Sequence, residues 1–310
     1  MKQVKDLVNG RVDFHIHPGP DPFARVLDSY EIAWLAERYN MKAIVFKSSN
    51  YQGGCVAEML NKEFHNLEVC GGICLEKVVG GFNPRAVDMA IQCGIKVLWF
   101  TFLDSKHNHE LWNPDVKDLS PGDYIMMRDL ATSRSDQRPG KYLNILDDDG
   151  NVVDGVREIL RLCADADIAV CSGHMGAPER KAFVREAKEA GCKRIVLTHV
   201  NAIQARNSYE ELEMWKKNDP DIFCELVFNP IVPYFSNQDP SVIKKMIDII
   251  GPDRCVLGTD LGISQAFKGL AWPSPLEGMA AFIGMLETLE VPDNAIDTMS
   301  IDTGSYLLNI

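Results

Sequence analysis

Eight short apolar runs, rich in β-branched and aromatic residues, recur along the chain, and helical patterning fills most of the gaps between them. The runs span residues 12–17, 43–47, 67–75, 96–102, 168–172, 194–199, 222–228 and 255–259. Because they are apolar on both faces, they are typical of a parallel sheet covered by helices. Eight strand–helix units predict an α/β fold, the (β/α)8 TIM barrel, whose active site lies at the C-terminal ends of the strands. A doubly wound open sheet is the alternative, but no glycine-rich phosphate fingerprint follows the first run.

Signals for helix starts and stops support this interpretation of the gaps. Asp28 and Asn83 are typical N-cap residues, and Pro84 suits a first helical turn. Further helices are expected over residues 154–166, 178–191, 208–218, 239–251, 276–289 and 293–301. The 310 residues would suffice for two average domains, but α/β barrels of this length form a single one. We therefore expect one barrel domain over residues 1–310.

One gap is much longer than the others. It follows the fourth run and contains polar chain, punctuated by proline and glycine, over approximately residues 104–149. A loop of this length inside a compact domain is usually functional. We expect an insertion after the fourth strand that covers the site as a lid.

Composition excludes several classes of function. The chain carries 32 Lys and Arg against 44 Asp and Glu, a formal net charge of −12, and such an acidic surface repels nucleic acids and anionic membranes. Nine cysteines without a Cys-x-x-Cys pair are scattered through mostly apolar segments, as expected for free thiols in a reducing cytoplasm. No apolar run reaches the ~18 residues of a transmembrane helix. We expect a cytoplasmic protein with no nucleic-acid or membrane partner.

Residues that can bind metals follow several of the predicted strands at their C-terminal ends. They are His15, His17, Lys47, His174, His199 and Asp260. Each alone has a structural explanation: a strand-end histidine is often a hydrogen-bonded structural residue, and Asp260 could be a helix N-cap. A barrel brings all its strand ends to one rim, so four imidazoles and a carboxylate would meet there. Together they predict a divalent metal site.

The order of these residues resembles the pattern of the amidohydrolase superfamily of metal-dependent hydrolases. That pattern is His-x-His on the first strand, a histidine ending the fifth strand, another ending the sixth, and an aspartate ending the eighth. In order, the matching residues are His15, His17, His174, His199 and Asp260. The resemblance extends to a closing helix near residues 302–308. Residues 45–48, 79–84 and 259–262 also resemble an uncharacterised bacterial amidohydrolase-like branch, which implies a fold and a metal site but no substrate.

Lys47 departs from that pattern. Binuclear members of the superfamily carry a carboxylated lysine or a glutamate at the end of strand four, whereas here the rim lysine follows the second run. Lys47 could be carboxylated and bridge two metals, stay cationic and bind a substrate carboxylate or phosphate, or form a structural ion pair. A cation beside divalent metals is unfavourable and a carbamate is an anionic oxygen ligand, so the bridging form is the leading hypothesis.

The resemblance implies a metal-dependent hydrolase in which one or two metal ions activate water. Neutral imidazoles and a carboxylate suit Zn²⁺ best, with Mn²⁺, Fe²⁺ and Ni²⁺ as alternatives. Asp260 would be the catalytic proton acceptor, and His199 or His174 would polarise the substrate if a single metal binds. A binuclear site would place one ion on His15, His17 and Asp260 and the other on His174 and His199, bridged by Lys47.

The substrate bond is expected to be an amide, cyclic amide, lactone or related C–N or C–O bond of a small molecule. Candidate substrate-binding residues follow the second, fourth and sixth strands, and they are Ser48, His107, His109, Arg134, Arg138 and Asn201. The basic stretch over residues 134–141 favours an anionic substrate group, although a solvated loop paired with nearby acids explains it equally well. His107 and His109 could instead be a second metal pair or solvated side chains.

Two other functions are alternatives. The first is a decarboxylase, hydratase or isomerase of the same superfamily that acts on a small carboxylate, and a single-metal site with a cationic Lys47 would favour it. The second is a barrel that binds a metal or ligand without turnover. The complete ligand set argues against it, because such a scaffold has no need of Asp260 as a proton shuttle. A homo-oligomer is expected on the resemblance alone.

Overall fold

The computed structural model describes residues 2–111, 142–205, 207–232, 236–263 and 274–310. Within these ranges, eight parallel strands form one sheet in the order of the sequence. They are β1 (Val12–Ile16), β2 (Ala43–Phe46), β3 (Glu68–Cys74), β4 (Val97–Trp99), β5 (Ala169–Cys171), β6 (Ile195–Leu197), β7 (Phe223–Val227) and β8 (Cys255–Gly258). Each strand lies inside one of the eight predicted runs and is shorter than the run at one or both ends.

Pairing between β1 and the chain that follows β8 closes the sheet. The backbone N–H of Asp260 donates to the carbonyl of His15 at 2.8 Å, and that of His17 donates to the carbonyl of Leu261 at 2.8 Å. Ile16 and Leu261 form a parallel bridge. The predicted (β/α)8 barrel is therefore confirmed, and closure brings the first and last of the candidate ligands to adjacent positions.

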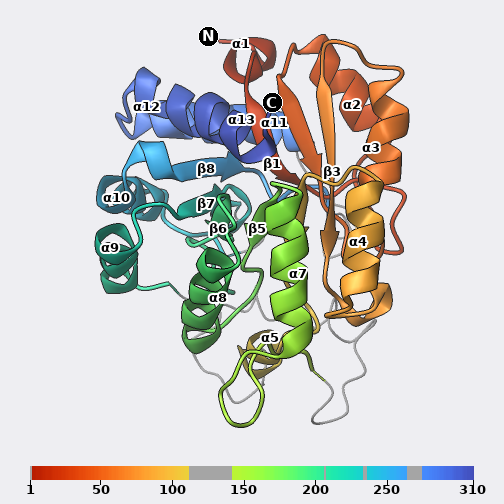
Figure 1. Ribbon diagram of the computed structural model, residues 1–310. Coiled ribbons are helices and arrows are strands. Elements are labelled where there is room, and N and C mark those ends of the chain that lie inside the picture. The colour runs from red at the N-terminus through yellow and green to blue at the C-terminus, as the bar shows by residue number, and fades with distance from the viewer. Residues whose placement is uncertain (1, 112–141, 206, 233–235, 264–273) are drawn as a thin grey trace.

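Helices cover the outside of the barrel, as Figure 1 shows. The helices in the described ranges, including those at the two ends of the barrel, are α1 (Val4–Val8), α2 (Ser29–Arg38), α3 (Gly54–Asn61), α4 (Pro84–Gln92), α5 (Lys106–Leu111), α7 (Asp154–Asp165), α8 (Ala177–Glu189), α9 (Tyr209–Asn218), α10 (Ser241–Ile250), α11 (Pro275–Thr288), α12 (Asp293–Asp297) and α13 (Thr303–Leu308). The side chains of Asp28 and Asn83 cap α2 and α4, as predicted. The helix predicted over residues 293–301 is α-helical only as far as Asp297, and a π-helical turn, η4 (Thr298–Asp302), follows it and leads into α13. Within the described ranges, no helix is both long enough and apolar enough to span a lipid bilayer.

Apolar side chains fill both faces of the sheet. A large cluster packs between the strands and the helices, and a smaller one fills the inside of the barrel. Leu307 and Leu308 of α13 belong to the inner cluster together with Val12 at the start of β1. Gly304 allows this approach, because a Cβ there would lie 2.9 Å from the Cβ of Val12. The C-terminal helix therefore closes the N-terminal end of the barrel, and the site has to use the opposite end.

β1 is irregular where the first candidate ligands lie. Its pairing with β2 shifts register between Asp13 and Ile16. Successive residues of a regular strand point to opposite faces, yet the rings of Phe14 and His15 both approach Trp99 inside the barrel, with centroids 6.4 and 5.8 Å away. A bulge re-aims side chains in this way. The irregularity thus turns His15 into the barrel.

The two ends of the predicted insertion lie side by side after β4. The backbone N–H of Lys106 donates to the carbonyl of Leu143 at 2.9 Å, and that of Leu143 donates to the carbonyl of Asp104 at 2.7 Å. α5 occupies the first end, where the sequence predicted only loop. Residues 112–141, the middle of the insertion, lie outside the described residues.

Candidate metal centre

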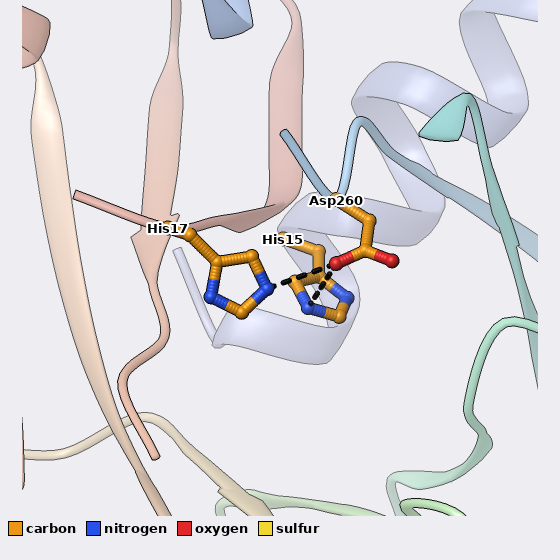
Figure 2. A group of neighbouring side chains, drawn as sticks. All are labelled: His15, His17 and Asp260. Carbon is orange, nitrogen blue, oxygen red and sulfur yellow. Dashed lines mark hydrogen bonds and ion pairs between the residues drawn. The ribbon is translucent and has the colours of Figure 1, made fainter. Parts of the chain in front are cut away.

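His15, His17 and Asp260 point toward one another at the C-terminal ends of β1 and β8, as Figure 2 shows. One carboxylate oxygen, Oδ1 of Asp260, lies 3.1 Å from Nε2 of His15 and 2.9 Å from Nε2 of His17. The ligand atoms of the three residues all lie within 4.8 Å of one another. Two nitrogens and one oxygen therefore converge from the two strands that close the barrel.

Hydrogen bonds on the far side of each ring orient these Nε2 atoms. Nδ1 of His15 lies 2.9 Å from Oε1 of Glu225, and Nδ1 of His17 lies 3.1 Å from the carbonyl oxygen of Lys47. Both partners are hydrogen-bond acceptors. A metal ion bound at the two Nε2 atoms would keep the ring protons on Nδ1, where Glu225 and the carbonyl of Lys47 accept them, which is the arrangement of metal-binding histidines.

Burial keeps the two imidazoles neutral. It lowers the pKa of His15 to about 3, with the charge of Lys47 adding to the effect, and it likewise lowers the pKa of His17 to about 3. Burial opposes ionisation of Asp260, but its interactions with His15, His17 and Lys47 hold the pKa of this carboxyl below its usual range. Neutral imidazole and ionised carboxylate are the forms that bind a divalent metal.

The backbone of Asp260 is held in a conformation that an aspartate rarely adopts. Its φ is 55°, in the left-handed region. The N–H of Asp260 is bonded to the carbonyl of His15, and its carbonyl accepts a hydrogen bond from Nδ2 of Asn229 at 2.7 Å. Strained conformations of this kind persist where neighbouring contacts fix them, and they occur at functional sites. Here these contacts direct the carboxylate toward the two histidines.

A second pair of histidines lies at the same end of the barrel. Nε2 of His174, after β5, is 3.1 Å from Nε2 of His199, after β6. Burial, and then His199, lower the pKa of His174 well below its ordinary value, and burial lowers the pKa of His199 to about 4. Asn108 accepts a hydrogen bond from Nδ1 of His174 at 2.8 Å. Nδ1 of His199 is buried and has no hydrogen-bond partner among the described residues.

Lys47 connects the two groups of histidines. It is buried, and its Nζ lies 2.9 Å from Nε2 of His15 and 3.1 Å from the centre of the Phe102 ring. That ring in turn packs edge-on against His174, with centroids 4.4 Å apart. No acidic side chain in the described part of the chain lies within 4.0 Å of Nζ, so the ion-pair explanation of Lys47 has no partner there.

These residues fit a divalent metal. Zn²⁺ binds imidazole nitrogen and carboxylate oxygen at about 2.0–2.2 Å, which places neighbouring ligand atoms about 3–3.5 Å apart. The 2.9 and 3.1 Å distances from Oδ1 of Asp260 are close to that range. The chemistry and spacing of His15, His17 and Asp260 are therefore those of residues that can hold one ion.

Two buried acids, Glu225 and Asp13, hold the candidate ligands in place by hydrogen bonds, and neither was predicted from the sequence. The second oxygen of Glu225 accepts the backbone N–H of His199 at 2.9 Å, so Glu225 connects His15 to the chain after β6. Asp13 accepts from the N–H and the hydroxyl of Thr259 at 2.9 and 2.7 Å, which joins β1 to β8. A signal was available for both residues, because an acid inside an otherwise apolar strand has to be paired when it is buried.

The candidate ligands open into a cavity with about 570 Å³ of empty space, part of which is open to solvent. It lies at the C-terminal end of the barrel, where the fold predicts a site. Its wall combines a few polar groups with aromatic and aliphatic side chains. The lining residues are His17, Phe23, Arg25, Lys47, Ser49, Phe102, Leu103, His174, His199, Gln204, Asn229, Asp260 and Ile263.

Two predicted substrate-binding residues, Ser48 and Asn201, make hydrogen bonds within the protein. The hydroxyl of Ser48 donates to Asp21 at 2.8 Å, and the side-chain oxygen of Asn201 accepts a backbone N–H of β7 at 2.9 Å. Neither lines the cavity, whereas their near neighbours Ser49 and Gln204 do. The loops that carry Ser48 and Asn201 therefore reach the cavity through other side chains.

His107 and His109 lie on α5, and neither lines the cavity. The ring of His109 packs near that of Tyr142, with centroids 6.1 Å apart. Neither histidine belongs to the cluster of three ligand-type residues found in the described chain. Arg134 and Arg138 lie outside the described residues.

Comparison with protein families gives one match, and comparison with curated proteins gives none. The model of a family of unknown function, DUF6282, matches residues 10–223. No curated protein matches the sequence significantly.

Solved structures share the fold at low sequence identity. An amidohydrolase from Pseudomonas aeruginosa has a TM-score of 0.61 at 12% identity, with 99% of this chain and 98% of that chain covered. An amidohydrolase from Burkholderia multivorans with bound zinc has a TM-score of 0.55 at 12% identity, with 97% and 99% covered. A 2,6-dihydroxybenzoate decarboxylase from Rhizobium has a TM-score of 0.53 at 10% identity, with 97% and 99% covered. The resemblance to the amidohydrolase superfamily is thus confirmed at the level of the fold, which hydrolases and decarboxylases share.

Proposed function

The chain belongs to the family of unknown function DUF6282, and we propose that this member is a metal-dependent hydrolase of a small molecule. The bond we expect it to cleave is an amide, cyclic amide, lactone or related C–N or C–O bond. One observation carries the proposal: Nε2 of His15 and of His17 converge on the carboxylate of Asp260 at the C-terminal end of the barrel. His17 and Asp260 also line the cavity, so a reacting molecule there would be beside the ion.

Zn²⁺ is the ion we expect, because neutral imidazoles and a carboxylate suit it and because a structure with this fold contains zinc. Mn²⁺, Fe²⁺ and Ni²⁺ also suit these ligands. A bound divalent metal would acidify a water molecule and polarise the bond under attack. His15, His17 and Asp260 would hold this ion, and His174 with His199 would hold a second one where two bind.

Asp260 has the position of the proton carrier. Its side chain is 17% exposed and lines the cavity, while Oδ1 faces the two histidines. From this position the carboxylate could accept a proton from water in the cavity and return it to the leaving group. His199 also lines the cavity and would polarise the substrate when only one ion is present.

For Lys47 we propose a carbamate that bridges two ions. The ammonium group would first lose a proton. The neutral nitrogen would then form a bond to the carbon of carbon dioxide and lose a second proton, which replaces a cation by a carbamate whose single negative charge is shared by two oxygens. The position supports this form, since Nζ lies next to Nε2 of His15 and beside the Phe102 ring that contacts His174. Lys47 makes no ion pair with a residue whose position is described.

A metal-dependent decarboxylase, hydratase or isomerase of a small carboxylate is the second candidate. One observation favours it: the described residues form a single cluster of three ligand-type side chains, as a one-metal centre would need. In that case Lys47 would stay cationic and bind a carboxylate of the substrate from its place in the cavity wall.

Substitution of the proton carrier tests the proposal. Zinc-loaded wild type and Asp260→Asn would be assayed on a panel of lactams, lactones and N-acyl amino acids, in water labelled with ¹⁸O. Hydrolysis incorporates the label into the product, whereas decarboxylation releases carbon dioxide. We expect label in the product and a loss of about 10²–10⁴-fold in kcat for Asp260→Asn.

Asp302→Asn, at an exposed position, is the matched control and should turn over like the wild type. Turnover of Asp260→Asn at the wild-type rate would remove Asp260 from proton transfer. Release of carbon dioxide without label in the product would favour the second candidate. Metal binding with no turnover of any compound would point to the non-catalytic barrel.

A further inference from the structure

Arg25 lies on the loop between β1 and α2, and this loop is attached to the chain that follows β8. The backbone N–H of Val26 donates to the carbonyl of Gly262 at 2.9 Å, and Arg25 and Ile263 form an antiparallel bridge. The segment that carries Asp260 therefore also positions Arg25. The side chain of Arg25 reaches the wall of the cavity.

The guanidinium of Arg25 is buried but poorly paired. Its side chain is 5% exposed, and its Nη2 lies 3.3 Å from Oδ1 of Asp21. Nε and Nη1 are also buried, and neither has a hydrogen-bond partner in the part of the chain that the structure describes. The pairing with Asp21 thus leaves most of the guanidinium donors unused.

Asp21 does not need Arg25 for its own pairing. Its carboxylate accepts hydrogen bonds from the Ser48 hydroxyl at 2.8 Å, from the Asn50 amide at 3.0 Å and from the backbone N–H of Phe23 at 2.8 Å. Neutral donors therefore satisfy the carboxylate of Asp21, whereas Arg25 has N–H groups with no acceptor among the described residues.

A buried guanidinium with unpaired donors is costly, because the ion has lost its water without full replacement. Arginine stays charged at any physiological pH, so it cannot avoid this cost by losing its proton. A carboxylate meets the planar fork of an arginine with two parallel hydrogen bonds, which would supply acceptors for the unused donors. Such charge-assisted pairs are stronger than hydrogen bonds to neutral acceptors, so a carboxylate is the group that suits the unused donors of Arg25 best.

The rest of the wall describes the body that carries this anion. Phe23, Phe102, Leu103 and Ile263 line the same cavity. Two rings and two aliphatic side chains suit an apolar group of about the size of a ring.

We propose that Arg25 binds a carboxylate group of the substrate and that the substrate is a carboxylate with a ring-sized apolar body. This proposal rests on the proposed function, since it places the reacting bond next to Asp260. It makes Arg25 a specificity residue of the cavity, distinct from the residues that hold the metal.

Binding of benzoate and of its neutral isostere benzamide tests the proposal by calorimetry. Zinc-loaded wild type should bind benzoate roughly 10- to 100-fold more tightly than benzamide, the difference expected for hydrogen bonds to a charged group. Arg25→Gln should lose that preference and keep its affinity for benzamide. Arg25→Lys retains the charge without the planar fork, so it should recover only part of the preference.

The same titrations on metal-free protein separate this proposal from the proposed function. A preference for benzoate that persists without zinc and is lost in Arg25→Gln is caused by the arginine. A preference that disappears without zinc and is unchanged in Arg25→Gln is caused by the metal, and this result would overturn the proposal. If Arg25→Gln unfolds, Arg25→Lys against wild type supplies the comparison. Wild type that shows no preference for benzoate, whether it binds both compounds or neither, also overturns it. Failure of zinc to bind would leave an Arg25-dependent preference intact and would count against the hydrolase alone.

Discussion

Glu225 does not line the cavity, yet two of the candidate ligands depend on it. One of its oxygens orients Nδ1 of His15, and the other holds the backbone of His199. Burial raises the pKa of Glu225 to about 7, against the opposing effects of His199 and Lys47. A cation at Nε2 of His15 would favour the charged form further. Such supporting carboxylates fix the tautomer of a histidine and strengthen it as a ligand.

Glu225→Gln is therefore expected to weaken metal binding. An amide has one acceptor oxygen, so either His15 or His199 loses its partner. We predict a decrease of about 10- to 100-fold in zinc affinity, measured by competition with a chelator of known affinity. Glu213→Gln, on the exposed face of α9, is the matched control. An affinity equal to that of the wild type would show that Glu225 does not orient the ligand.

At the scale of elements, the turn after β8 brings two loops together at the site. Gly262 has a φ of 122°, and a Cβ there would lie 2.0 Å from the carbonyl oxygen of His17. Its own carbonyl accepts the N–H of Val26 on the loop that carries Arg25. A side chain at this position would push apart the ends of β1 and β8, which hold the candidate ligands.

Gly262→Ala should consequently lose stability and metal affinity together. Gly150→Ala separates the two causes, because Gly150 also has a positive φ, 83°, but has no atom within 4 Å of the added Cβ. We expect Gly150→Ala to lose about 1–2 kcal/mol from backbone strain alone, and Gly262→Ala to lose more. Urea unfolding and zinc titration of both variants measure this. Equal losses with unchanged zinc binding would contradict the close approach at Gly262.

Glu76 joins the chain after β3 to the chain after β4. Its carboxylate accepts the backbone N–H groups of Phe102, Leu103 and Asp104 at 2.7, 3.0 and 2.9 Å. Phe102 and Leu103 line the cavity, so this contact shapes its wall. Burial, together with the neighbouring charge of Asp104, raises the pKa of Glu76 to about 8.

This raised pKa predicts a pH-dependent stability. The folded protein holds the proton of Glu76 more tightly than the unfolded chain, whose ordinary pKa is 4.5. The contribution of protonated Glu76 to the free energy of unfolding is therefore complete below about pH 4.5 and is lost as the pH rises through about 8. Metal-free wild type should lose free energy of unfolding relative to Glu76→Gln between about pH 5.5 and pH 8.5. Glu63→Gln, at an exposed position, should show the same pH dependence as the wild type. A difference in free energy of unfolding between wild type and Glu76→Gln that stays constant over this pH range would contradict the raised pKa of Glu76.

The strands and caps were predictable because their causes are local. Apolar runs and capping residues such as Asp28 act within a few residues, and the structure has them where the pattern predicts. The shift of register in β1, which turns His15 inward, depends on the pairing with β2 and leaves no local pattern. Arg25 was missed for the same reason, since its loop is positioned by residues 262 and 263, far along the chain.

At the scale of the whole molecule, barrel closure makes the site. His17 and Asp260 are 243 residues apart in sequence, and their side chains are 2.9 Å apart. Figure 1 shows both termini at one end of the barrel and α5 at the other, so the N-terminal end is structural and the C-terminal end is free for chemistry. The chain is acidic overall, but Lys47 and Arg25 face the cavity, so the net charge describes the outer surface rather than the site.

The central claim is that His15, His17 and Asp260 hold a divalent metal, and anomalous X-ray diffraction tests it most directly. Crystals of zinc-loaded protein would be measured above and below the zinc edge. We predict an anomalous peak about 2.0–2.2 Å from Nε2 of His15, Nε2 of His17 and the carboxylate of Asp260. A second peak near His174 and His199, with density for a carbamate on Lys47, would establish the binuclear form. Absence of a peak at His15, His17 and Asp260 in zinc-loaded crystals would contradict the account.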